Sequence, residues 1–174
     1  MRAVDDDAPA DTSMMRIVHD ALRRDLDRAR THLAQPRDAD QRRAIGDHLG
    51  WLMSFLHAHH ESEDAGLYPL TRERATGDAT ALAVLDDMGR DHEGIAAAIT
   101  GVESAGAELS QDPSDAAAAS AVAALDALSS VLLPHLRREE DEAMPIVSRL
   151  VTRGEWSALE QKHNLDPKST TELG

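Results

Sequence analysis

Two stretches of the sequence decide the fold: HHESEDAGLYP, residues 59–69, and HLRREEDEAMP, residues 135–145. In each stretch a His is followed four residues later by a Glu, the Glu is followed directly by another acid, and a Pro comes ten residues after the first His. Residues four apart lie on one face of an α-helix, so each stretch predicts a helix that presents a His and a Glu side by side. The chain therefore contains a repeated helical unit with a polar pair on one face.

Apolar residues recur at steps of three and four along four segments, roughly 13–35, 38–66, 78–110 and 114–144. This spacing is typical of amphipathic helices, and no stretch shows the alternation of a half-buried strand. Short links around residues 36 and 112 join the first helix to the second and the third to the fourth, which makes each pair antiparallel. The sequence predicts an all-α protein, an up-down-up-down four-helix bundle.

The segment boundaries follow from composition and from proline. Residues 1–12 are rich in Asp, Ala and Pro, and we expect a disordered lead. The bundle is expected over 13–153, and residues 154–174 are expected to form a short extra helix and a flexible tail. Pro69 and Pro145 are expected to end the second and fourth helices, because proline lacks the N–H that a helix interior requires.

Composition excludes several functional classes. The formal net charge of −14 argues against nucleic acid and anionic membranes as partners, and 2 % aromatic residues argues against a base-stacking surface. The chain has no Cys, which excludes thiolate metal sites and disulfides, and no apolar run approaches the length of a membrane span. We expect a cytoplasmic protein without a signal peptide. Nine His in 174 residues are the exception in a chain that otherwise has few rings.

Six polar residues lie on the apolar stripes, where a plain bundle would have none. They are His19, His59, Glu63, His92, His135 and Glu139. A buried ionised Glu without a partner costs several kcal/mol, and no stripe contains a Lys or Arg. Imidazoles and carboxylates that converge in a bundle core therefore indicate a bound cation. The repeat, with its two-fold character, suits two metal ions better than one.

Other residues near these stripes have simpler interpretations. His57 and Glu61 also have the spacing of a pair, but they lie on the opposite side of their helix and are expected to be exposed. His60 lies about 100° from the stripe and is the nearest spare His. Trp51 and Phe55 form a second apolar stripe and are expected to pack between helices.

The six stripe residues, in their order and spacing, resemble the motif of the hemerythrin-like, or HHE cation-binding, family. The resemblance covers roughly residues 13–153. It implies a non-haem di-iron centre with an oxo or hydroxo bridge, in which His19 and His59 bind one ion and His92 and His135 the other. Glu63 and Glu139 would bridge the two ions.

The match departs from hemerythrin proper, which has five His and a His-x-x-x-His pair on its third helix. In this chain the positions four residues before and after His92 are Met88 and Ala96. Four His and two bridging carboxylates leave two positions open on a pair of six-coordinate ions. Either substrate binds there, or a fifth ligand comes from His60, Asp64 or Glu140.

The resemblance and the ligand chemistry together set the functional expectation. Nitrogen and oxygen ligands without sulfur suit iron, with manganese or zinc less favoured. The leading hypothesis is a di-iron protein that binds or reacts with O2, peroxide or nitric oxide, protecting against oxidative or nitrosative stress. One alternative is a di-iron oxidase or oxygenase acting on a small organic substrate. Another is a module that senses or stores iron or oxygen.

Overall fold

The computed structural model describes residues 5–164 of the chain, and all of its regular elements are helical. Two short π-helical segments, η1 and η2, interrupt the α-helices. In chain order the elements are α1 (Ser13–Leu33), α2 (Ala39–Ser62), η1 (Glu63–Leu67), α3 (Tyr68–Arg74), α4 (Ala79–Gln111), α5 (Asp115–Arg138), η2 (Glu139–Ala143), α6 (Met144–Leu150) and α7 (Arg153–Asn164).

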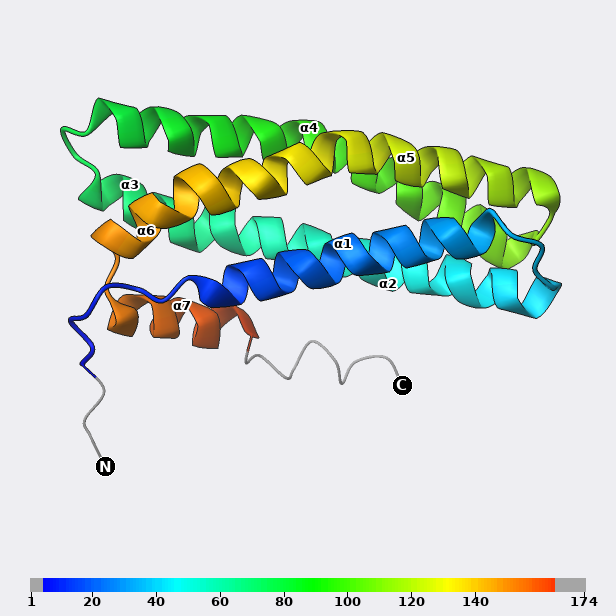
Figure 1. The fold of residues 1–174 in the computed structure, drawn as a ribbon, viewed down its shortest axis with the longest axis horizontal. Coiled ribbons are helices and arrows are strands. Elements are labelled where there is room, and N and C mark those ends of the chain that lie inside the picture. Colours follow the sequence, from blue (N-terminus) through cyan, green and yellow to red (C-terminus); the bar gives the residue numbers. More distant parts are fainter. Residues whose placement is uncertain (1–4, 165–174) are drawn as a thin grey trace.

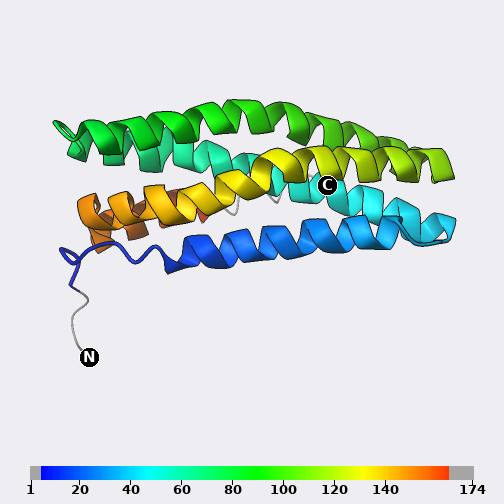
Figure 2. The same cartoon turned by 45° about the horizontal axis from the view of Figure 1, so that its top comes forward.

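The four long helices α1, α2, α4 and α5 pack side by side as a bundle, which confirms the predicted fold class (Figure 1; Figure 2). Each runs antiparallel to the next, and α2 packs against α4, α4 against α5, and α1 against both α5 and α2. Aliphatic side chains from all four helices fill the interior, among them Leu22, Leu52, Val102 and Leu128. The residues of the three-and-four stripes form this core, because that spacing keeps them on the inward face.

The second and fourth helices do not end at Pro69 and Pro145, contrary to expectation. Each passes through a π-helical segment and continues, α2 into α3 and α5 into α6. In the π turns the N–H of Tyr68 donates to the carbonyl of Glu63, and the N–H of Met144 donates to that of Glu139. The prolines therefore fall in the first turn of a new helix, where a missing N–H costs no bond.

Helix α4 is the longest of the four and extends well beyond the ends of α1. It begins at Ala79, where the Asp78 carboxylate caps it by accepting from the N–H of Ala81. It packs against α3 and η2, and this end has an apolar core of its own, which includes Leu85 and Met144. Because of this added length, His92 lies farther from the nearer end of its helix than the other stripe His lie from theirs. All four His nevertheless meet at one level of the bundle.

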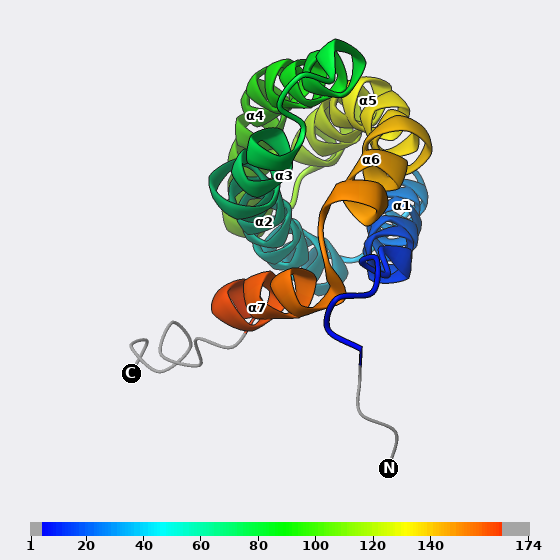
Figure 3. The same ribbon diagram turned by 90° about the vertical axis from the view of Figure 1, so that its left-hand side faces the viewer.

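Residues 5–12 are ordered rather than disordered. Ala10 is buried, its N–H donates to the carbonyl of Val151, and the N–H of Arg153 donates to the carbonyl of Ala8. These bonds tie the lead to the start of α7, which lies beside the ends of α1 and α2 (Figure 3). The predicted short C-terminal helix is thus confirmed, whereas the predicted tail over residues 165–174 lies outside the described part.

Two further sequence features concern the surface of the bundle. Trp51 and Phe55 do not pack between helices: they are 60 % and 40 % exposed on the outer side of α2. By length and composition alone, the continuous helix Asp115–Leu150 is long and apolar enough to cross a membrane. Much of its apolar character is alanine, and its large residues, such as Leu125 and Leu132, are fully buried in the bundle.

Candidate metal centre

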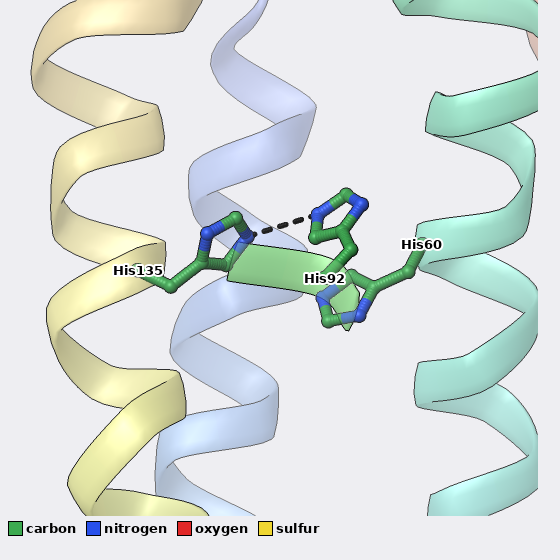
Figure 4. Close-up of side chains that lie close together, drawn as sticks. All are labelled: His60, His92 and His135. Atoms are coloured by element: carbon green, nitrogen blue, oxygen red, sulfur yellow. Dashed lines mark hydrogen bonds between the residues drawn. The ribbon is translucent and has the colours of Figure 1, made fainter. Parts of the chain in front are cut away.

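Seven polar side chains converge in the interior of the bundle, at the level where α2 continues into η1 and α5 continues into η2. They form two adjoining groups, each with ligand atoms within 4.8 Å of one another: His19, His59, Glu63 and Glu139 in the first group, and His60, His92 and His135 in the second. Figure 4 shows the second group, in which rings from α2, α4 and α5 point toward one another. All seven are buried except His59, which is nearly so.

The carboxylates of Glu63 and Glu139 lie between the two groups, and each is close to a ring nitrogen of the first group and a ring nitrogen of the second. From a carboxylate oxygen to the nearest Nε2 atoms the distances are 3.0 Å (Glu63 to His59), 3.5 Å (Glu63 to His92), 3.3 Å (Glu139 to His19) and 3.7 Å (Glu139 to His135). Each Glu therefore lies beside one imidazole of each group.

The outer ring nitrogens of three His are held by carboxylates. The Nδ1 atoms of His19, His92 and His135 lie 2.9, 2.8 and 3.3 Å from oxygens of Glu140, Asp64 and Asp91 respectively. An ionised carboxylate only accepts, so the ring Nδ1–H donates and the Nε2 lone pair points inward. Carboxylates that orient His in this way are typical of metal sites.

In the first group Nε2 of His19 lies 3.3 Å from Nε2 of His59, whose tautomer no carboxylate contact at Nδ1 fixes within the described residues. In the second group the inward-pointing nitrogens face each other without a proton between them, with Nε2 of His92 3.0 Å from Nε2 of His135. Two lone pairs at this separation repel, and a cation placed between them would convert the repulsion into coordination. The geometry of all four rings fits metal ligation.

The buried acids reinforce this conclusion. Burial, followed by the negative charge of Glu139, raises the pKa of Glu63 well above its ordinary value. For Glu139 burial alone would raise the pKa, but the neighbouring imidazoles of His19 and His135 and the Tyr68 hydroxyl lower it to about 2. Two carboxylates this close in an apolar interior cannot both ionise unless positive charge is added.

His60 joins the second group, although it lies off the stripe of its helix. It is 5 % exposed, its ring stacks on that of His92 at 4.1 Å, and burial lowers the pKa of His60 to about 2. A ring held neutral is in the state that a metal ligand requires. In the repeat the equivalent of His60 is Leu136, so the two halves of the centre are unequal.

Unsatisfied polar atoms test whether these residues fit a metal. Among the described residues, the buried side-chain atoms without a hydrogen-bond partner are Nε2 of His60, both carboxylate oxygens of Glu63 and Oε2 of Glu139. All of them belong to the two groups, and leaving them unpaired would cost several kcal/mol. Nitrogen and carboxylate oxygen are donors that iron, manganese and zinc accept, so the residues present fit such ions.

The structure brings together all six residues that the sequence singled out. It places Asp64 and Glu140 on the outer nitrogens of His92 and His19 rather than toward the inward Nε2 atoms. His57 and Glu61 are exposed, as expected.

Two participants were missed by sequence reasoning. Asp91 contacts His135 and is held in turn by Arg138, at 3.0 Å. Tyr68 is buried and its hydroxyl donates to Glu139. In a regular α-helix Tyr68 would lie about 140° from Glu63, and only the π turn stacks these residues five apart on one face. The one available signal was its position as the only Tyr of the sequence, within the repeated stretch.

Comparison with known proteins agrees with this geometry. Residues 10–147 match the family described as the hemerythrin HHE cation binding domain. The match covers most of the chain and all seven residues of the two groups, so the chain belongs to this family. No curated protein and no solved structure matches the chain.

Proposed function

We propose that this hemerythrin HHE domain protein binds two iron ions, one in each group, and uses them to bind or react with O2, peroxide or nitric oxide. The observation that supports this most is the pair of orphaned carboxylates, Glu63 and Glu139, placed between two sets of imidazoles. A carboxylate-bridged metal pair in a helical bundle favours iron, or manganese, over zinc. Such a pair supplies redox chemistry toward small oxidants.

The inclusion of His60 changes the ligand count. With five imidazoles and two bridging carboxylates, a bridged pair of six-coordinate ions keeps one open position instead of the two that four His would leave. The three imidazoles of the second group would complete the ligands on that side, so the open position would belong to the side of His19 and His59. One open position suits the binding of a small diatomic or peroxide molecule.

The residues of this chain would contribute in three ways. Glu140 and Asp64 hold the imidazoles of His19 and His92 in the ligating orientation. Burial of both carboxylates excludes bulk water and strengthens each electrostatic contact. Burial raises the pKa of Tyr68 well above its ordinary value, which keeps a proton on its hydroxyl oxygen beside Glu139. That hydroxyl is the proton donor nearest to the bridging carboxylates.

Metal analysis with visible spectroscopy of the aerobically purified protein tests this proposal. We expect about two irons per chain and the near-ultraviolet bands of a bridged ferric pair. The reduced protein should consume peroxide or nitric oxide, and the apoprotein should not. Stoichiometric zinc alone, in protein from iron-sufficient cells, would contradict the proposal.

A further inference from the structure

A pocket of about 360 Å³ opens beside the first metal group, between α1, α2 and α7. Its walls are mainly apolar and include Met14, Val18, Phe55, Leu67, Trp156 and Leu159. At its inner end it reaches His59 and Glu63, and no residue of the second group lines it. The pocket therefore leads to the side of the centre that keeps an open coordination position.

The pocket is much larger than a diatomic ligand needs. A water molecule takes a share of about 30 Å³ in the liquid, and O2 or nitric oxide is of similar size. The volume instead falls in the range of about 300–1,000 Å³ that is typical of sites for small organic molecules. An apolar site of this size next to a metal centre favours an organic ligand.

The charged residues that line the pocket limit the class of ligand that it can bind. No Lys or Arg lines the pocket, while Glu63 lies at its inner end and Glu160 in its wall. An anion would pass Glu160 and find no Lys or Arg along the walls, and a cation would approach a centre that would carry metal ions. Desolvation of either ion by the apolar walls would also cost free energy. The walls therefore fit an uncharged molecule.

Helix α7 makes this pocket a feature of the chain rather than of its family. The family match ends at residue 147, and α7 begins at Arg153. Trp156, which is buried, packs in the apolar cluster at this end of the bundle, with Leu159 against it, and these residues close one side of the pocket. Without α7 the pocket would lose this wall, while Met14 and Phe55 remain 50 % and 40 % exposed beside it.

The opposite face of the centre offers an internal contrast. A second pocket, of about 440 Å³, reaches His60 and His92. Its lining includes several charged or titratable side chains, among them His57, Glu61 and Glu93. The two faces therefore differ in the residues that line them, mostly charged or titratable on one side and mainly apolar on the α7 side.

We propose that the pocket between α1, α2 and α7 binds an uncharged, mainly apolar organic molecule, with a hydroxyl or carbonyl oxygen directed at the metal held by His19 and His59. This inference rests on the proposed function and adds a ligand class to it. It gives the centre an organic ligand in addition to a small oxidant.

Binding of four aromatic probes of similar size, two neutral, one anionic and one cationic, to the purified holoprotein tests the inference. Toluene, phenol, benzoate and benzylamine can be compared by ligand-detected NMR and by tryptophan fluorescence, since Trp156 forms part of the wall. We expect phenol and toluene to bind, and benzoate and benzylamine to bind about tenfold more weakly or less. Equal affinity for benzoate and phenol would overturn the inference.

A matched pair of variants locates the binding. Ala58 and Ala96 are both exposed helical alanines, one lining the apolar pocket and the other the opposite pocket. Ala58→Trp should fill the apolar pocket and weaken phenol binding about tenfold or more, whereas Ala96→Trp should leave it within about twofold. Equal effects of both variants, or no effect of Ala58→Trp, would overturn the assignment.

A charge variant keeps the test decisive even if Ala58→Trp does not fold. Leu159→Lys adds a cation to the wall and should raise benzoate affinity relative to phenol about tenfold, while unchanged selectivity would count against the pocket. Iron content is measured on the same samples. Iron-free protein that binds phenol would refute the proposed function but support the pocket, and iron-loaded protein that binds no probe would refute the pocket alone.

Discussion

His60 is the residue that makes the two halves of the centre unequal. The repeat relates His19 to His92, His59 to His135 and Glu63 to Glu139, but His60 corresponds to Leu136. One group therefore has three imidazoles and the other has two imidazoles with both carboxylates close by. The two groups would hold their ions differently, one ion more completely and the other with a position left accessible.

Replacing His60 should release one metal preferentially. We expect His60→Ala to reduce the metal content from about two ions per chain toward one, because the second group loses a third of its imidazoles. His57→Ala is the matched control, since His57 is exposed on the same helix and should leave the content unchanged. Metal analysis after gel filtration measures both, and equal metal loss in the two variants would contradict the assignment of His60.

The bridging carboxylates should matter far more than the acid beside them. Glu63→Ala and Glu139→Ala each remove an oxygen pair that lies between the groups, so we expect loss of most of the bound metal. Glu61→Ala should retain it, because Glu61 is exposed. Isothermal titration of the apoproteins with Fe²⁺ under anaerobic conditions compares the three. Similar affinity in Glu61→Ala and Glu63→Ala would show that the helix phase assigned here is wrong.

Six of the seven grouped residues were predictable because helical spacing alone puts them on the inward stripes. His60 was not fixed in this way: a bundle helix buries a face wider than 100°, and a residue beside the stripe faces inward or outward depending on how the helix is rotated. The role of Tyr68 could not be predicted for a different reason. The direction of its side chain depends on a π turn, which apolar spacing does not reveal.

At the scale of elements, the π segments determine where the centre lies. Each begins at one of the two buried carboxylates of the centre, Glu63 in η1 and Glu139 in η2. A π turn takes one residue more than an α turn, and such turns are frequent at functional sites. In η1 the added residue lets Tyr68 and Thr71 face the interior beyond the carboxylate. The same device in both halves is consistent with the duplicated sequence.

Removing the added residue of η1 tests its role. Deleting Ala65, which is exposed, should restore an α turn and rotate the rest of the helix by about 100°, turning Tyr68 and Thr71 away from the core. We expect a loss of stability of about 2 kcal/mol or more and weaker metal binding. The length-preserving variant Ala65→Ser is the control. Thermal unfolding that is the same for the deletion and for Ala65→Ser would show that η1 is incidental.

At the scale of the whole molecule, the fold was predictable because four long amphipathic stripes with short links allow few arrangements. The features that the sequence did not predict lie at the ends of the bundle helices. Ordering of residues 5–12 depends on backbone bonds to Val151 and Arg153, which are distant in sequence and leave no local pattern. Pro69 and Pro145 end helices in most contexts, and only the π turns make them compatible with continuation.

The metal-free protein should lose stability in acid through its buried His. Burial lowers the pKa of His59 to about 4 and that of His60 to about 2, so both stay neutral in the folded state while the unfolded chain takes up protons below about pH 6.5. These two neutral His contribute fully to the free energy of unfolding above pH 6.5. As the pH falls below that value, this contribution is lost at about 1.4 kcal/mol per pH unit for each His. The raised pKa of Glu63 acts in the opposite sense, since it favours folding at low pH and loses that effect as the pH rises.

Comparison with a variant isolates the part due to His60. In chelator-treated protein, His60→Leu removes one buried imidazole and introduces the residue found at the equivalent position, Leu136. Between pH 6.5 and 4.5 its free energy of unfolding should fall by about 1.4 kcal/mol per pH unit less than that of the parent. Urea unfolding at several pH values measures both slopes. Parallel slopes would mean that His60 takes up its proton in the folded state and is not held neutral for a metal.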